Sequence, residues 1–180
     1  MKPARIIVVS GIQGAGKTTI GRLLAGRFTR GVHIEADALQ RMIVSGGQWV
    51  SDVGDPQGEA ARQLRLRLHN ACLLARSFAE AGFTAVVDDI IIGDRFGQLR
   101  EELAGMQFHL VVLGPDVETV IARDASRDKA VGEAWARHLD AEQRRTMTGI
   151  GLWVDSSGQT AAETVDEIIS RIAREGLVES

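Results

Sequence analysis

The chain is nearly free of cysteine: among its 180 residues, Cys72 is the single example. One cysteine excludes a disulfide within the chain and offers no cysteine cluster that could hold a metal. Cys72 stands next to Ala71, Leu73 and Leu74. This apolar context favours a buried structural thiol over a nucleophile.

An excess of charge and a long apolar run are also missing. The chain carries 21 Lys and Arg against 24 Asp and Glu, a formal net charge of −3. Such a balance indicates no basic surface for a nucleic acid or an anionic membrane. No apolar run approaches the roughly 20 residues of a membrane span, and the first predicted strand begins too early to leave room for a signal peptide. We therefore expect a cytoplasmic protein without a membrane or nucleic-acid partner.

The length suits one compact domain with a sizeable core and is too short for two. Short β-rich runs alternate with helical patterns, which predicts an α/β fold with a parallel sheet and right-handed crossovers. Predicted strands cover residues 5–10, 32–34, 83–87, 108–113 and 152–154. Predicted helices include residues 19–27, 38–44, 57–81 and 135–145, and a final amphipathic helix follows a capping box at Thr160 and Glu163.

One stretch, residues 11–18, reads Gly-Ile-Gln-Gly-Ala-Gly-Lys-Thr and fits the pattern G-x-x-x-x-G-K-[ST]. It lies between a predicted strand and a predicted helix, as a phosphate-binding loop requires. Its glycines permit a tight turn in which backbone N–H groups and a helix N-terminus converge on an anion. Lys17 is expected to reach the β- and γ-phosphates, and Thr18 to offer its hydroxyl to Mg²⁺. The predicted nucleotide-binding residues are Gly11, Ile12, Gln13, Gly14, Ala15, Gly16, Lys17, Thr18 and Thr19.

Two carboxylates, Asp88 and Asp89, end the apolar strand 83–87. Mg²⁺ takes few protein carboxylates, and the carboxyl edge of a parallel sheet is where ligands bind. Because side chains alternate along a strand, only one of the two can face the site. We predict that Asp88 or Asp89 serves the metal, with Asp89 also a candidate for the substrate. The alternative is that both cap the strand in solvent.

The segment after the second predicted strand carries further candidates. A hydroxyl that accepts a phosphoryl group needs a carboxylate to orient it and take its proton, and Asp37 is our candidate. Asp37 also suits the N-cap of the following helix. Arg41 is a candidate for an ion pair with Asp37 or for gripping an anionic substrate, and a plain surface role is equally open. Trp49 is a candidate for an apolar wall of the substrate site.

Two arginines, Arg123 and Arg127, are four residues apart and share one face of a predicted helix. Guanidinium groups that close over a transferring phosphoryl group neutralise its charge and exclude water. The alternative is an exposed helix with local salt bridges. His33 and His69 have no spacing typical of a metal site, and structural or surface roles are expected.

Taken together, these parts resemble the small P-loop kinases of the nucleoside-monophosphate-kinase-like group, within it the chloramphenicol phosphotransferase-like and zeta-toxin-like AAA kinase families. The matching pieces are residues 11–18, Asp37, Asp88-Asp89, residues 123–127 and residues 151–157.

The resemblance implies a three-layer fold with a five-stranded parallel sheet, ordered 2-3-1-4-5, and helices on both faces. It implies Asp37 as general base, Arg123 and Arg127 as lid arginines, and a loop for the nucleotide base at residues 156–159. A single domain over residues 1–180 would then hold a substrate-binding helical insert at 38–82 and a lid at about 123–148.

The leading interpretation is an ATP-dependent kinase that uses Mg²⁺ and transfers the γ-phosphoryl group to a small-molecule hydroxyl. An antibiotic, a sugar or a nucleoside-type metabolite fits this class. Alternatives are a regulatory nucleotide-binding or ATPase module without an acceptor, and a zeta-toxin-like or nucleic-acid-end kinase. The acidic balance counts against a polynucleotide.

Overall fold

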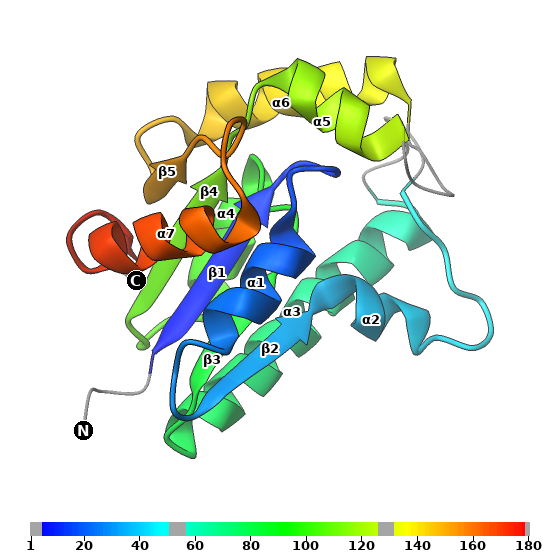
Figure 1. Cartoon of the computed structure of the whole chain (residues 1–180). Coiled ribbons are helices and arrows are strands. Elements are labelled where there is room, and N and C mark those ends of the chain that lie inside the picture. Colours follow the sequence, from blue (N-terminus) through cyan, green and yellow to red (C-terminus); the bar gives the residue numbers. More distant parts are fainter. Residues whose placement is uncertain (1–4, 51–56, 126–131, 179–180) are drawn as a thin grey trace.

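The computed structural model describes residues 5–50, 57–125 and 132–178. Five parallel strands form its central sheet in the order β2-β3-β1-β4-β5, as the family resemblance implied (Figure 1). The strands are β1 Ile6–Gly11, β2 Gly31–Glu35, β3 Thr84–Asp88, β4 Phe108–Leu113 and β5 Leu152–Val154. A short sixth strand that we did not predict, β6 Leu177–Val178, pairs antiparallel with the start of β4.

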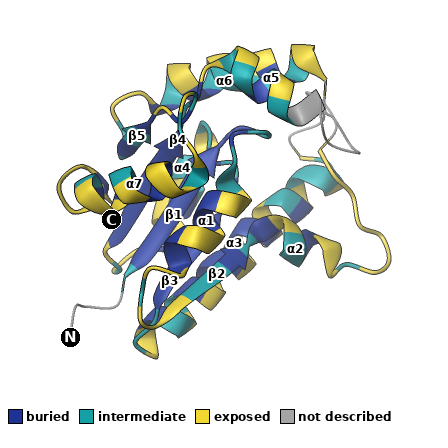
Figure 2. Ribbon diagram, viewed as in Figure 1, coloured by how far each residue is buried: buried dark blue, intermediate teal, exposed yellow. Residues whose placement is uncertain are grey.

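Helices cover both faces of this sheet, which makes three layers (Figure 1). In chain order they are α1 Lys17–Ala25, α2 Ala36–Arg41, α3 Glu59–Glu80, α4 Asp94–Glu102, α5 Val117–Ala125, α6 Glu133–Met147 and α7 Ala161–Glu175. Ile6 and Val8 belong to the core beneath α3 and α4. Ile7 and Val9 belong to the core beneath α1 and α7. Because alternate residues of β1 face opposite layers, the whole strand is buried and its first four residues are all apolar (Figure 2).

Several local expectations are confirmed. The capping box at Thr160 and Glu163 is formed in full at the start of α7. Cys72 lies on the buried side of α3, where desolvation raises the pKa of its thiol to about 12. The thiol is therefore protonated at neutral pH and has the structural role that its apolar neighbours indicated.

The helix expected at residues 38–44 is α2, which begins two residues earlier. Glu35 is its N-cap, so Asp37 lies inside the first turn and the N-cap interpretation of Asp37 is wrong. Within the parts of the chain that the structure describes, none of the helices combines the length and the apolar character that a membrane span requires.

Candidate functional site

The phosphate-binding loop joins β1 to α1 at the carboxyl edge of the sheet. Gly14 and Gly16 have φ angles of +86° and +93°, values that side chains other than glycine rarely adopt. A Cβ at Gly11 would lie 3.0 Å from the carbonyl oxygen of Leu113, so the loop also needs glycine to pass close to β4. Lys17 Nζ donates to the carbonyl oxygen of Ile12 at 3.0 Å, which holds the ammonium group across the loop.

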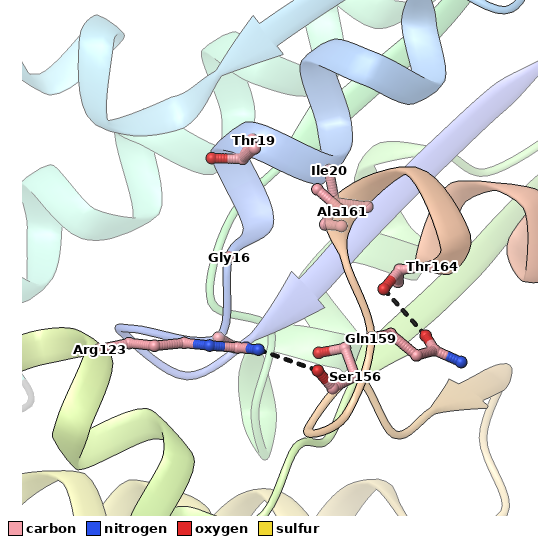
Figure 3. Close-up of a pocket in the computed structure, with 9 residues that line it drawn as sticks. Gly16, Thr19, Ile20, Arg123, Ser156, Gln159, Ala161 and Thr164 are labelled. Atoms are coloured by element: carbon pink, nitrogen blue, oxygen red, sulfur yellow. Dashed lines mark hydrogen bonds between the residues drawn. The ribbon is translucent and has the colours of Figure 1, made fainter.

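A cavity of about 270 Å³ adjoins this loop between α1, α5 and the segment after β5 (Figure 3). Its volume is close to the lower end of the range typical of small-molecule sites. Arg123 bounds it and donates from Nη2 to the carbonyl oxygen of Ser156 at 2.9 Å. The lining residues are Ala15, Gly16, Thr19, Ile20, Arg123, Ser156, Gln159, Ala161 and Thr164.

Ser156 lines this cavity, but its side-chain hydroxyl does not open into it. Its side chain is buried, and its Oγ has no hydrogen-bond partner in the structure. An unsatisfied buried hydroxyl is costly, but this oxygen is closed off from the cavity and a ligand there does not reach it unless Ser156 moves. Gln159, by contrast, is held in place, because it accepts from Thr164 Oγ1 at 2.9 Å and donates to Glu167 at 2.6 Å.

Asp88 ends β3 directly beside the loop. Thr18 Oγ1 donates to its Oδ1 at 3.4 Å, and His33 Nε2 lies 2.5 Å from its Oδ2. Because a carboxylate oxygen accepts, the imidazole proton must be on Nε2. A hydroxyl and a carboxylate are the hard oxygen ligands that Mg²⁺ prefers, and it needs few of them beside phosphate and water. The pair Thr18 and Asp88 therefore fits the metal. His33 binds this carboxylate, a contact that the sequence analysis missed.

The side chain of Asp89 points away from Thr18 and binds two arginines. Arg67 Nη2 donates to its Oδ1 at 2.5 Å, and Arg95 Nη2 donates to its Oδ2 at 2.5 Å. Its side chain is only 1% exposed. Both oxygens are thus taken by guanidinium groups, and alternation along the strand directs only Asp88 toward Thr18. The structure does not bring Asp89 to the metal position or leave it open to a substrate.

Asp37 lies at the first turn of α2 and is half-exposed. Its Oδ1 accepts from Arg67 Nη1 at 2.7 Å. Arg67 therefore bridges the exposed Asp37 and the buried Asp89. The ring of Trp49 has its centroid 6.0 Å from the guanidinium carbon of Arg67, at the outer limit of a cation–π contact. Trp49 and Asp37 thus flank the same arginine.

Arg41 takes a different partner from the one expected. It donates from Nη2 to Glu35 Oε1 at 2.6 Å, and this hydrogen bond raises the pKa of its guanidinium. No bond joins it to Asp37 among the contacts of the described residues. Arg127 lies outside the described residues.

Arg67 is the most important residue that the sequence analysis passed over. It stands one residue before Leu68 and four before Ala71, and both of those residues are buried in the core on a helix that covers the sheet. Helical spacing therefore places Arg67 on the inner face. A charged residue on such a face signals a buried partner.

We expect Arg67→Met to lower the free energy of unfolding by about 3–5 kcal/mol, because it leaves buried Asp89 with only one of its two cations. Denaturant unfolding measures this change. Arg62→Met is the matched control: Arg62 pairs with Glu59 on the exposed start of α3, and its loss should cost about 1 kcal/mol or less. Equal destabilisation by the two variants would contradict a stabilising role for the buried ion pair between Arg67 and Asp89.

Comparison with known proteins places these features in a family. A family model described as an AAA domain matches residues 6–149, which include the phosphate loop, Asp37, Asp88 and Arg123. The chain belongs to the AAA domain family. Among curated protein sequences, none is significantly similar to this AAA domain.

Solved structures resemble this AAA domain over nearly its whole length. A sugar kinase from Janibacter sp. HTCC2649 aligns with a TM-score of 0.67 at 20% identity, covering 93% of this chain and 94% of that chain. Shikimate kinase from Acinetobacter baumannii aligns with a TM-score of 0.68 at 21% identity, covering 93% and 92%. The APS kinase CysC from Mycobacterium tuberculosis gives 0.70 at 16% identity, covering 93% and 96%. The fold is therefore that of the small P-loop kinases.

Proposed function

We propose that this AAA domain is an ATP-dependent phosphotransferase that moves the γ-phosphoryl group of ATP to a hydroxyl of a small molecule. The observation that carries the proposal is the arrangement around the phosphate loop. On one side lies a cavity of about 270 Å³, and on the other lies Asp37, an exposed carboxylate held by a buried arginine. A protein that only binds a nucleotide has no need of a carboxylate held in this position.

The nucleotide side of the proposal rests on the loop and the cavity. Backbone N–H groups of the loop and the N-terminus of α1 would hold the phosphates, with Lys17 at the β- and γ-phosphates. The base would fill the cavity. Arg123, at the cavity wall, would neutralise phosphate charge, and Arg127 stays a second candidate for that role.

The metal side rests on Thr18 and Asp88. Mg²⁺, when bound there, would neutralise charge on the phosphate oxygens. Asp88 can present Oδ1 toward Thr18 because His33 holds its other oxygen. His33 would thus orient the carboxylate without touching the metal.

On the acceptor side, Asp37 would take the proton of the attacking hydroxyl. The hydroxyl oxygen forms a bond to the γ-phosphorus, and the bond between that phosphorus and the β,γ-bridging oxygen breaks, which releases ADP. Arg67 occupies one oxygen of Asp37 and leaves the other for the acceptor. A fixed carboxylate of this kind positions the nucleophile, which is the main task in phosphoryl transfer.

A screen with γ-labelled ATP tests the proposal. Purified protein with Mg²⁺ is incubated with sugars, nucleosides and hydroxylated antibiotics, and label transfer is measured. We expect transfer to at least one acceptor. ATP hydrolysis that no acceptor alters, without labelled product, would instead support a regulatory ATPase module.

We expect His33→Ala to weaken Mg²⁺ binding to the nucleotide-loaded protein by about tenfold, since loss of a residue that orients a metal ligand has effects of this size. A Mg²⁺ titration followed by a fluorescent ATP analogue measures it. His69→Ala is the matched control, because His69 binds the carboxylate of Glu102 at 2.7 Å away from the loop. If the midpoint of the Mg²⁺ titration is unchanged in His33→Ala, His33 does not help to orient the metal ligand Asp88.

A further inference from the structure

The loop after α2, residues 42–50, lies outside the apolar core. It forms neither helix nor strand, and most of its residues are exposed (Figure 2). None of these described residues belongs to either of the two buried apolar clusters. Met42 and Val44 are 72% and 98% exposed. Burial in the core therefore does not position this loop.

Two glutamine side chains hold the loop instead, Gln40 from the last turn of α2 and Gln63 from near the start of α3. Gln63 Nε2 donates to the carbonyl oxygen of Gly46 at 2.8 Å, and Gln63 Oε1 accepts from the backbone N–H of Gln48 at 2.7 Å. Gln40 Nε2 donates to the carbonyl oxygen of Gln48 at 2.9 Å. Three hydrogen bonds thus tie the loop backbone to α2 and α3. We call Gln40 and Gln63 the glutamine clamp.

The side chain of Gln63 uses its full hydrogen-bonding capacity. Besides its two bonds to the loop, its Nε2 donates to Glu59 Oε1 at 2.8 Å, and its Oε1 accepts from Gln40 Nε2 at 3.0 Å. A glutamine amide offers two donor protons and two acceptor lone pairs, so all four are taken. Gln63 is 7% exposed and Gln40 is 5% exposed. Moving the loop away would leave these buried amides short of partners, which is costly.

The glutamine clamp also limits where Trp49 can lie, because Trp49 directly follows Gln48 in the chain. The Trp49 side chain is half-exposed, and its ring lies over the guanidinium group of Arg67. Arg67 in turn holds Asp37, the candidate base. The ring is therefore in place beside the acceptor side of the site before a ligand arrives.

We propose that Gln63 is a positioning residue for the acceptor: through the glutamine clamp it keeps Trp49 over Arg67 as a preformed wall of the acceptor site. This role rests on the proposed phosphotransferase function and adds a residue to it. Gln63 itself contacts neither the acceptor nor the nucleotide. A preformed wall avoids the cost of ordering the loop when the acceptor binds. Gln63 therefore acts on the affinity for the acceptor and leaves the chemical step to Asp37.

Gln63→Met tests this role, because methionine has a similar length, carries no charge and makes none of the four bonds. The acceptor is the best substrate among the sugars, nucleosides and hydroxylated antibiotics of the labelled-ATP screen. We expect its KM to rise about tenfold, the scale of ordering one or two side chains on binding, with kcat nearly unchanged. That combination is the pattern of lost uniform binding. The affinity for ATP should not change, because Gln63 does not line the cavity beside the phosphate loop.

A second readout follows Trp49 without any acceptor. In NMR spectra of the nitrogen-labelled full chain, the indole N–H signal of Trp49 is identified by its loss in Trp49→Phe. We expect its relaxation in the wild type to resemble that of Trp153, whose indole donates to the carbonyl oxygen of Met147 at 3.1 Å. In Gln63→Met the Trp49 signal should show greater motion. A merely structural role of Gln63 would lower stability without these two changes.

Gln98→Met is the matched control. Gln98 Nε2 donates to the carbonyl oxygen of Arg65 at 2.9 Å in an exposed contact between α4 and α3, and its loss should change neither KM nor the motion of Trp49. Gln40→Met removes one of the three bonds to the loop, so we expect a smaller change in the same direction as in Gln63→Met. If thermal unfolding shows that Gln63→Met does not fold, Gln40→Met decides the outcome.

The outcomes separate this role from the phosphotransferase itself. Label transfer by Gln63→Met with an unchanged KM overturns the positioning role and leaves the phosphotransferase standing. So does a fall in kcat alone, or equal motion of Trp49 in Gln63→Met and Gln98→Met. Absence of transfer to any acceptor by the wild type overturns the phosphotransferase and the acceptor role of Gln63 with it, whatever the motion of Trp49.

Discussion

Asp37→Asn is expected to lower phosphoryl transfer to the acceptor by about 10²- to 10⁴-fold, the range that a positioned general base contributes. Asparagine keeps an oxygen for the bond from Arg67 Nη1, so the ion network loses little geometry. What it loses is the carboxylate oxygen that takes the proton. The kcat and KM for the best acceptor measure the effect, together with the affinity for ATP.

The affinity for ATP should not change in Asp37→Asn, because Asp37 is not among the residues that line the cavity beside the loop. Asp166→Asn provides the comparison. Asp166 is also an exposed aspartate bound to an arginine, Arg27, but it lies on α7. Its replacement should leave transfer intact. If Asp37→Asn transfers the phosphoryl group at the normal rate, Asp37 is not the general base.

The inner strands β1, β3 and β4 could be predicted because their residues are buried on both faces. A strand such as β4 Phe108–Leu113 is buried throughout and apolar at every position except His109, and its flanks contain Gly105 and Gly114. Its predicted bounds agree with the structure residue for residue. β6 could not be found in this way, since its two residues carry no periodicity and pair only at the edge of β4.

The choice between Asp88 and Asp89 shows where sequence reasoning stops. Alternation along β3 predicts that one of the two faces the loop. Which one does so depends on how β3 sits in the sheet. Its register places Asp88 opposite Val9 of β1 and Glu35 of β2. That register comes from the packing of the whole sheet, and no local pattern encodes it.

The same limit applies to the pairs that shape the acceptor side. Arg67 is 30 residues from Asp37 and 22 from Asp89. Helical periodicity places Arg67 on an inner face, but the identity of its partners needs α2, α3 and β3 in three dimensions. Residues within one motif, such as Lys17 and Thr18, are positioned by local turn chemistry and were therefore predictable.

Lys17→Ala is expected to lower both acceptor phosphorylation and ATP hydrolysis by about 10²- to 10³-fold, as the loss of one preorganised charge at a phosphoryl group does. The ammonium group is held across the loop by the carbonyl oxygen of Ile12, so it is in place before ATP arrives. Alanine leaves the glycine turns intact, and the fold should persist. Thermal unfolding checks the fold, and equilibrium binding checks the affinity for ATP, which should also fall.

Arg22→Ala is the control for charge removal on α1, because Arg22 is exposed on that helix and does not line the cavity. It should retain transfer and hydrolysis. Lys17→Ala and Asp37→Asn should differ in which reactions they lose. Loss of Lys17 lowers phosphoryl transfer to every acceptor, water included. Loss of the Asp37 carboxylate lowers only the transfer to the acceptor hydroxyl that needs this base. If Lys17→Ala binds and turns over ATP as the wild type does, the loop does not hold the phosphates, and the site as a whole is misassigned.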